Sequence, residues 1–502
     1  MIPMEFMAPV MFGMLIVVML IGFPAAFSLG ALGLGFGFLA VSWGYFPEAF
    51  LSNLPLRVFG IMSNDLLLAI PFFTFMGAIL ERCGLAEDLL EGSGQLFGGL
   101  PGGLGFAVII VGAILGAITG TVAASVIAMG VISLPIMMRY GYDMRYATGV
   151  IAASGTITQL IPPSLVLVVL ADQLGKPVGD LYKGAIGPSI LQTLIFLAYT
   201  VAVAVLRPKW VPPLPPEARV QRGWALWKRV LWGMIPSIVL IFLVLGTIFM
   251  SWATATEAGA LGAIGALVLA AMHRRLSWKL VWQGMDSTMR LTAMVVFILI
   301  GSSVFSLVFQ GVDGAKWIEN MLSHLPGGRI GFLVVVNIFV FFLAFFLDFF
   351  EIAFIIVPLL APVADKLGID LIWFGVLLCV NMQTSFMHPP FGFALFYLRG
   401  IADQIHKGGA IDRPVASRDI YLGALPWVAM QLLLVAVVIF WPNSVSYWLD
   451  KEVAVDLDKV KIEAPADETP PAPTTPSSEP AVDDADSRAL NDALKSEAAS
   501  GK

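Results

Sequence analysis

The chain has 502 residues, of which 58% are hydrophobic and only 13% are charged, against about a quarter charged in an average soluble protein. Long runs carry no acidic or basic residue, such as the run between Glu91 and Arg139, and a helix needs about 20 apolar residues to span a bilayer. This pattern excludes an ordinary soluble protein. The net charge of −6 comes largely from the C-terminal tail and gives no indication of a nucleic-acid partner.

The N-terminus and the scarce reactive residues exclude further classes of protein. The first apolar run has no basic start and leads directly into a second run, so it does not predict a cleaved signal peptide. Cys83 and Cys379 are isolated and the four histidines are scattered, without the spacing of a transition-metal site. The sequence contains neither a catalytic cluster in its apolar runs nor a GxxxxGK phosphate loop. It therefore predicts neither an enzyme nor a nucleotide-driven pump, and no cofactor.

The first half, residues 1–206, contains continuous predicted spans near residues 7–22, 24–42, 66–82 and 184–206. The uncharged stretch at about 92–138 is too long for one span, and a polar, glycine-rich run from Gly116 to Thr121 interrupts it. Non-helical backbone at membrane depth is stable only where protein buries it or water reaches it. We therefore predict a re-entrant helical hairpin at about 92–138, followed by a span at about 146–171 that is broken at Pro162-Pro163.

Residues 207–229 are predicted to form a linker between the two halves. The segment is rich in proline and carries six arginine or lysine residues against one glutamate. Because basic connections between spans face the cytoplasm, the linker is expected on the cytoplasmic side.

The second half, residues 230–441, restarts the same order, with continuous predicted spans near residues 230–250, 255–272, 288–310 and 420–441. Two short apolar pieces at about 330–364 flank Asp348-Phe349-Phe350-Glu351 and predict a second re-entrant hairpin. A span at about 371–398 follows, and Pro389-Pro390 breaks it. Residues 442–502 are rich in Pro, Ala, Ser, Thr and acids, and we expect a disordered tail because they cannot bury a core.

The two halves match at their broken spans. The segment SGTITQLIPPS starts at Ser154 and NMQTSFMHPPF starts at Asn381, and in each the tandem proline begins eight residues after the first residue. Each half has five crossings and one hairpin that returns to its own side, so the second half is predicted to be inverted. Inverted repeats with broken helices at corresponding positions are typical of secondary transporters, with the site at the repeat interface. We predict an all-α polytopic membrane protein of two inverted repeats, each with a re-entrant hairpin and a broken helix.

Clusters of basic residues give the expected orientation. If the first hairpin enters from the cytoplasm and the second from the periplasm, the cytoplasmic clusters are those at 139–145, 207–229, 273–279 and 399–418. Both termini then lie on the periplasmic side.

The tandem prolines remove backbone donors and leave carbonyl oxygens without helical partners. Sodium accepts neutral oxygen ligands, and the C-terminal ends of half-helices add partial negative charge. The predicted sodium ligands are Thr119, Gly120, Thr121, Ser154, Gly155, Thr156 and Pro162 in the first half, and Asp348, Asn381, Thr384, Ser385 and Pro389 in the second. The candidate substrate ligands are Thr121, Ser164 and His388.

Structural alternatives stay open for these residues. Small residues at helix breaks also serve close helix packing. Asp348 lies beside a half-span of apolar residues, where charge is costly and usually functional, but a solvated tip or a structural partner also explains it. His388 is a candidate for binding an anionic substrate or carrying a proton, and a packed neutral histidine fits as well.

Several segments spread over residues 1–441 carry a family resemblance: IPFF from Ile70 with Met76-Gly77, LPGG from Leu100, GAITGTVAAS from Gly116, Gly141-Tyr142-Asp143, AASGTITQLIPPS from Ala152, TATEAGA from Thr254 and LDFFEIAFIIVP from Leu347. They resemble the large membrane subunit of TRAP (tripartite ATP-independent periplasmic) transporters. The resemblance implies an elevator-type fold of the ion-transporter superfamily in the bacterial inner membrane. It also implies sodium-driven uptake of a small organic acid, with a small four-helix membrane subunit and a periplasmic substrate-binding protein as partners.

The chain departs from the family pattern in its second half. Where the family often has Thr or Ser after the hairpin acid, this chain has Phe349-Phe350-Glu351, and His388 stands where an aliphatic residue or Thr often precedes the tandem proline. The second ion site then depends more on backbone carbonyls. These features resemble the branch often labelled for mannitol or chloroaromatic transport.

The alternative function is another ion-coupled carrier, or a channel, that has the same architecture and works without a binding protein. Uptake that saturates and follows the sodium gradient distinguishes a carrier from a channel.

Overall fold

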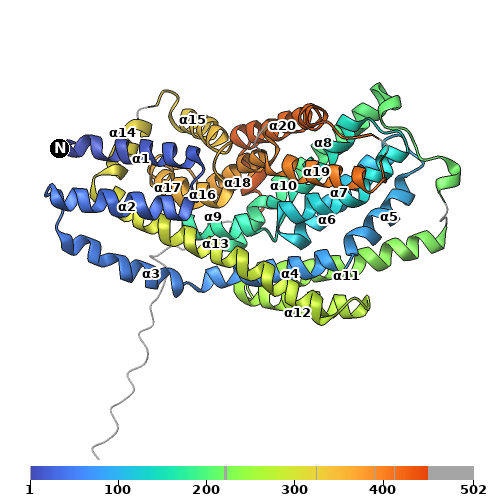
Figure 1. Cartoon of the computed structure of the whole chain (residues 1–502), viewed down its shortest axis with the longest axis horizontal. Helices are drawn as coiled ribbons and strands as arrows, with labels where there is room; N and C mark the ends of the chain where they lie inside the picture. Colours follow the sequence, from blue (N-terminus) through green and yellow to red (C-terminus); the bar gives the residue numbers. More distant parts are fainter. Residues whose placement is uncertain (1, 220–222, 324, 390–391, 412, 450–502) are drawn as a thin grey trace, which may run out of the picture. The chain divides into compact units, whose positions relative to one another are not determined.

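The computed structural model describes residues 2–219, 223–323, 325–389, 392–411 and 413–449. In this part of the chain every regular element is helical (Figure 1). The predicted disordered tail, residues 442–502, lies outside the described residues from Asp450 onward, and its described start contains the short helix α21, Asn443–Ser446.

The helices of the first half, in chain order, are α1 (Met4–Ile21), α2 (Ala25–Ser42), α3 (Leu54–Met62), α4 (Ala69–Arg82), α5 (Leu85–Phe97), α6 (Gly103–Thr119), α7 (Val122–Arg139), α8 (Met144–Thr156), α9 (Leu165–Leu174) and α10 (Val178–Leu206). Shorter 3-10 turns lie before and after α3 and directly after α8, at Glu48–Asn53, Asp65–Leu68 and Ile157–Gln159.

The helices of the second half are α11 (Trp224–Phe249), α12 (Ala255–Met272), α13 (Trp278–Gly311), α14 (Gly314–Ser323), α15 (Gly328–Leu343), α16 (Phe349–Glu351), α17 (Val357–Lys366), α18 (Leu371–Met382), α19 (Phe393–Lys407) and α20 (Ser417–Phe440). A π-helical turn, Ile352–Ile356, joins α16 to α17, and a 3-10 turn, Gln383–Met387, follows α18.

The helices include many that suit a bilayer. Within the described residues, eight are long and apolar enough to cross a membrane, or up to ten spans exist if each bent helix pair counts as one. One bent pair joins Glu48–Met62 to Asp65–Arg82 at 47°, and the other joins Gly314–Ser323 to Gly328–Leu343 at 117°. The prediction of an all-helical protein with many spans is therefore confirmed.

Local sequence signals set the helix boundaries around the breaks. α6 ends where Gly120 adopts a left-handed conformation with φ of +63°, which glycine allows without strain. α8 follows Asp143 and α18 follows Asp370, and each carboxylate accepts hydrogen bonds from backbone N–H groups of the first helical turn. Both broken spans therefore begin with an acidic N-cap, which is among the strongest helix-start signals.

The same order of elements occurs in both halves. Helices α6 to α10 correspond to α15 and α17 to α20, with the short α16 opening the second hairpin helix. Both predicted hairpins have a non-helical tip, at 120–121 and at 344–348, and both predicted broken spans leave the α-helix through a 3-10 turn. The inversion of one half relative to the other and the orientation in the membrane stay predictions.

The first hairpin starts later than the predicted residue 92. The separate helix α5 extends to Phe97 and α6 begins at Gly103, so the two hairpin helices span 103–139. Between α5 and α6 lies Leu100-Pro101-Gly102, and Gly102 has a φ of +80°. A proline-glycine turn therefore divides the uncharged stretch that sequence reading treats as continuous.

The linker predicted for residues 207–229 is partly packed, and α11 replaces it from Trp224 onward. Val211 is fully buried, and its carbonyl oxygen accepts from the N–H of Gly102 at 2.9 Å. The carbonyl oxygen of Trp210 accepts from the N–H of Asp143 at 2.8 Å. These bonds fasten the linker to the turns before α6 and α8, while residues 220–222 lie outside the described residues.

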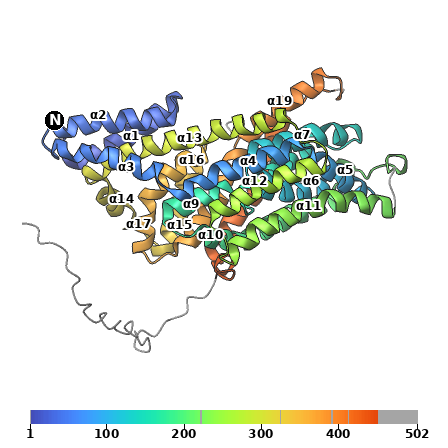
Figure 2. The same cartoon turned by 90° about the horizontal axis from the view of Figure 1, so that it is seen from below.

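Contacts between helices place both breaks in the interior of the unit formed by Met1–Leu449. In two perpendicular views, α1 and α2 lie at one end of this unit and α5 lies at the other (Figures 1 and 2). Towards the middle, α9 packs against α18, and α8 packs against α20. Each broken span therefore contacts a helix of the other half.

Candidate functional site

The first break connects α8 to α9 through a 3-10 turn and Pro162-Pro163. Side chains satisfy some of the carbonyl oxygens that the break frees: Ser164 Oγ donates to Gln159 O, and Ser189 Oγ on α10 donates to Leu160 O at 3.0 Å. Ser164 Oγ also accepts from a backbone N–H of α9 at 3.2 Å and so caps that helix. Ser164, a predicted substrate ligand, thus has a structural role in closing the break.

The first hairpin packs directly onto this break. A Cβ added at Gly112 would lie 2.7 Å from Ser154 Cβ, and one at Gly116 would lie 3.0 Å from Thr158 Cα. α6 therefore approaches the broken span more closely than residues with side chains allow. From the other hairpin helix, α7, Ser125 Oγ forms a hydrogen bond with Thr158 Oγ1 at 3.0 Å. The break is held between the two helices of the hairpin.

The tip of the hairpin reaches the start of α9. A Cβ at Gly120 would lie 3.7 Å from Leu165 Cγ, and Thr121 is half-buried with an extended backbone. The side chain of Thr119 lies outside the described residues. Since Ser154 lies beside Gly112, well before the tip, the structure arranges the first-half candidates along the hairpin instead of gathering them at one point.

Threonine hydroxyl groups at the first break donate to carbonyl oxygens of the preceding helical turn. Thr156 Oγ1 donates to Ala153 O at 2.9 Å, and Thr158 Oγ1 donates to Gly155 O at 2.7 Å. A hydroxyl that gives its proton to the preceding turn keeps lone pairs for a cation. Ser154 Oγ is buried and has no hydrogen-bond partner among the described residues. A buried polar atom without a partner is costly, and a bound cation would remove that cost.

The second break repeats this backward bonding. Thr384 Oγ1 donates to Asn381 O at 2.7 Å, and Ser385 Oγ donates to Met382 O at 2.6 Å. Asn381 Nδ2 donates to the carbonyl oxygen of Asn337 at 2.8 Å, which ties α18 to the hairpin helix α15. All these side chains are buried. The predicted second-half ligands of the broken span therefore share one buried segment.

Asp348 at the second hairpin tip starts a helix. Its carboxylate accepts from the N–H of Phe349. It also accepts from the N–H of Glu351, while Asp348 N–H donates to Glu351 Oε2 at 2.9 Å, and these two reciprocal bonds form a capping box. Asp348 is half-buried. Asp348 therefore has a structural role as a helix cap. A carboxylate offers about four lone-pair sites, so Asp348 can still bind a cation as well.

His388 is enclosed by aromatic side chains of the second hairpin. Its ring centroid lies 4.2 Å from that of Phe341 and 4.3 Å from that of Phe345. The residue is 1% exposed, and neither ring nitrogen has a partner among the described residues. Pro389 is half-buried and Pro390 lies outside the described residues, whereas Pro162 of the first break is buried. His388 therefore has the surroundings of a packed histidine, with both nitrogens still available.

Two hydrogen bonds join the first break to the second half of the chain. Cys379 Sγ on α18 donates to Gln159 O at 3.4 Å. Gln431 Nε2 on α20 donates to Thr156 Oγ1 at 3.1 Å. The backbone and side chains of the first break are therefore in direct contact with the second half of the chain.

Buried glutamines are polar residues that sequence reasoning did not single out, and Gln431, which bonds to Thr156 of the first break, is the candidate functional residue among them. The side-chain amides of Gln159, Gln192 and Gln383 have no hydrogen-bond partner among the described residues, and Gln431 uses only its Nε2. All four residues are at most 1% exposed. The sequence does contain a signal for them, because a lone polar residue inside an apolar span is usually functional. This signal is clearest for the glutamines of α10 and α20.

The two breaks together offer hydroxyl, carbonyl, amide and carboxylate oxygens. Hard cations prefer such ligands, and discontinuous membrane helices commonly use them for coupling ions. This set of oxygen atoms is therefore suited to reversible cation binding.

The family model for the DctM component of tripartite ATP-independent periplasmic transporters matches residues 12–444. The C4-dicarboxylate TRAP transporter large permease protein DctM of Rhodobacter capsulatus is 30% identical over 455 residues, covering 87% of this chain and 97% of that protein. The isethionate TRAP transporter permease protein DctMQ of Oleidesulfovibrio alaskensis is 27% identical over 396 residues, covering 79% of this chain and 60% of that protein.

A solved structure supports the fold independently. The crystal structure of the Alcanivorax borkumensis YdaH transporter matches with a TM-score of 0.56 at 15% identity, covering 78% of this chain and 87% of that chain. The relatives are named as transporter permeases, so the predictions of a non-enzyme and of a multi-pass inner-membrane protein are confirmed. The chain belongs to the DctM family, the large membrane components of tripartite ATP-independent periplasmic transporters, as the resemblance implied.

Proposed function

We propose that this chain is the translocating subunit that moves an organic anion into the cell together with sodium, after a periplasmic binding protein has delivered the anion. Family membership makes the chain part of a tripartite transporter with a small membrane subunit and a periplasmic binding protein. The two relatives described above are named for C4-dicarboxylates and isethionate, and both are organic anions. These names support the substrate class of the proposal.

The observation that carries the sodium assignment is the pair of matched breaks. In each half, hydroxyls such as Thr156 and Thr384 donate to the preceding turn. Thr384 Oγ1 keeps its lone pairs for a cation, and Thr156 Oγ1 keeps one beside the bond that it accepts from Gln431 Nε2. Both hydroxyls are fully buried, so water cannot readily satisfy them. A desolvated cation is the ligand that such neutral oxygens accept best.

Energetics favour more than one ion. Each sodium ion that enters a cell at −100 mV contributes about 2.3 kcal/mol from the membrane potential. Two ions carried with a singly charged anion still move one net positive charge inward, so the potential drives uptake. One site at each break would supply this stoichiometry.

The test is uptake into proteoliposomes that contain this chain, its small membrane subunit and its binding protein. We expect saturable uptake of the anion that the binding protein retains, with a strict requirement for external sodium. Full uptake with lithium or protons in the absence of sodium would show that the assignment of sodium as the coupling ion is wrong. Strong uptake by this chain without the binding protein would support the alternative of an independent carrier, and flux that does not saturate would support a channel.

A further inference from the structure

A cavity of about 840 Å³ lies away from both breaks, at the end of α7 and the start of α20. The turn from α7 into α8 forms one wall, and the segment between α19 and α20 forms the other. Its lining residues are Met138, Arg139, Gly141, Tyr142, Asp143, Met144, Arg145, Ala410, Ile411, Arg413, Pro414 and Asp419. The cavity therefore joins a turn of the first half to a connection of the second half.

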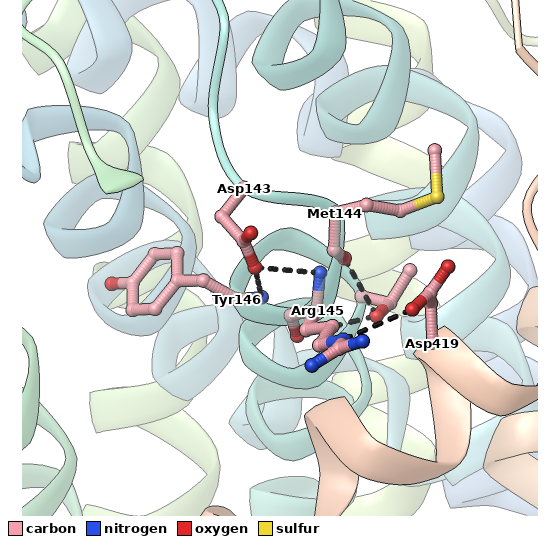
Figure 3. A network of polar contacts seen from close by, with 6 residues as sticks. Asp143, Met144, Arg145, Tyr146 and Asp419 are labelled. Atoms are coloured by element: carbon pink, nitrogen blue, oxygen red, sulfur yellow. Dashed lines mark hydrogen bonds and ion pairs between the residues drawn. The ribbon is translucent and has the colours of Figure 1, made fainter. Parts of the chain in front are cut away.

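Both acidic residues in this lining already have partners. Asp143 accepts from the backbone N–H groups of Arg145 and Tyr146 at 3.0 and 3.2 Å. Asp419 accepts from the side chain of Arg145, with 3.0 Å between Nε and Oδ1. Figure 3 shows both acids around Arg145, one on each side of the boundary between the halves. Neither carboxylate forms an ion pair with Arg139 or Arg413 among the described residues.

Arg139 and Arg413 are two further basic residues of the lining. Both side chains are exposed, and neither has a carboxylate partner among the described residues. Arg139 lies only near the ring of Tyr140, 6.0 Å from its centroid. The lining thus contains two guanidinium groups that form no ion pair with the described residues and can bind an anion.

The position of the cavity at the ends of two candidate spans points to the lipid head groups. α7 and α20 are both candidate membrane spans, and the cavity lies where α7 ends at Arg139 and α20 begins at Ser417. The neighbouring linker places Arg207 over the ring of Trp210 at 4.2 Å, and tryptophan and arginine are both common at membrane interfaces. The positive-inside rule puts these basic residues on the cytoplasmic side.

We propose that this cavity binds the phosphate of an anionic phospholipid head group through Arg139 and Arg413. The planar guanidinium fork matches phosphate oxygens in pairs, and basic pockets between spans on the cytoplasmic side bind such head groups. The volume is within the range of pockets that enclose small ligands. A lipid bound here contacts both halves of the chain, so it stabilises their packing whichever solute the transporter carries.

The test uses the purified full-length chain in an uncharged detergent. Phosphatidylglycerol, phosphatidylcholine with the same acyl chains and inorganic phosphate are titrated separately, and bound lipid is counted by native mass spectrometry alongside the melting temperature. We expect phosphatidylglycerol to bind and to raise the melting temperature, while phosphatidylcholine and millimolar phosphate do neither. The double variant Arg139→Gln/Arg413→Gln should bind phosphatidylglycerol about 25-fold more weakly, since each arginine near an anionic lipid contributes roughly 1 kcal/mol, or about fivefold.

Two further variants separate binding from folding and from overall charge. Arg399→Gln, an exposed arginine on α19 outside the cavity lining, should change the affinity less than twofold. Arg139→Lys/Arg413→Lys keeps the charge but removes the fork, so it should bind with intermediate affinity even if the glutamine pair fails to fold. Equal binding of the two lipids, unchanged binding by both double variants, or stabilisation by inorganic phosphate instead of lipid would each overturn the proposal.

Discussion

The two breaks share a backbone plan but differ in what surrounds them. The first is enclosed by glycines and hydroxyls, and Ser125 of the hairpin is hydrogen-bonded to Thr158 of the break. The second is enclosed by aromatic rings: Phe345 lies against His388, and the rings of Phe349 and Phe386 are 6.3 Å apart. The two breaks therefore have similar backbone geometry, but the first has polar surroundings and the second has aromatic surroundings.

This difference teaches that the two proposed ion sites need not use the same ligands. The position that corresponds to Gly155 is Met382, a fully buried side chain, so the second break has room where the first is pressed against its hairpin. Side-chain hydroxyls fixed by close packing can serve the first site. The second has Asp348 at its tip and otherwise depends more on backbone carbonyls.

The largest effect is expected from Gly155→Val. A Cβ at this position would lie 2.3 Å from Val126 Cγ2 and 3.0 Å from Val126 N, so the hairpin must move away from the break. Overpacking of this kind costs roughly 1–3 kcal/mol, and we expect near-complete loss of sodium-driven uptake with a lower melting temperature. Met382→Leu, a volume-conserving change at the matching position, should retain most uptake. A Gly155→Val protein with normal melting and uptake would show that the first break is not tightly packed.

The second-largest effect is expected from Asp348→Asn, which removes the charge and keeps the helix cap, because Asn and Asp cap equally well. If the carboxylate binds sodium, the sodium concentration for half-maximal uptake should rise about tenfold, equivalent to about 1.4 kcal/mol. The melting temperature should stay unchanged. Thr384→Ala, which removes a neutral ligand, should raise that concentration only about threefold. The opposite ranking would mean that Asp348 only caps the helix and that neutral oxygens form the site.

A smaller effect is expected from Gln431→Leu. This change removes the hydrogen bond to Thr156 Oγ1, and a hydrogen bond of about 1 kcal/mol corresponds to a fivefold rise in the sodium concentration for half-maximal uptake. Gln192→Leu on α10 is the matched control, because its amide has no partner among the described residues. It should leave sodium dependence unchanged and not lower the melting temperature. Equal effects of both variants would exclude a specific role for the bond to Thr156.

The smallest effect is expected from deleting the chain from Glu463 onward. The deleted segment is rich in Pro, Ala, Ser, Thr and acids, a composition that cannot bury a core. Uptake and melting temperature should both remain within experimental error of the full chain. A clear loss of uptake, with normal amounts of protein in the membrane, would reveal a function for the tail.

The positions of the breaks were accessible from sequence because their causes are local. Pro162-Pro163 prevents regular helix in the preceding turn, and α8 accordingly ends at Thr156 before the tandem proline. A local signal was also overlooked: Asp348 and Glu351 have the spacing of a capping box, which the structure contains. The sequence therefore already indicated that Asp348 begins a helix.

Other features depend on contacts that no local pattern encodes. Gln431 and Thr156 are 275 residues apart, and they meet only because α20 packs on α8. The buried Val211 in a proline-rich linker likewise depends on the turn at Gly102, which supplies the N–H that bonds to it. Such long-range packing determines which polar groups are left without partners, so residue spacing could not show which buried amides lack a hydrogen bond.

The contact between Cys379 and the first break has a practical consequence for chemical labelling. Cys379 and Cys83 are the only cysteines of the chain, and both are buried. A maleimide reacts with accessible thiols, so the protein at rest should resist modification. Reagent can reach Cys379 only when α18 separates from the carbonyl of Gln159. The part of the labelling that Cys379→Ser removes therefore reports how often the centre of the chain opens, and the labelling that remains comes from Cys83.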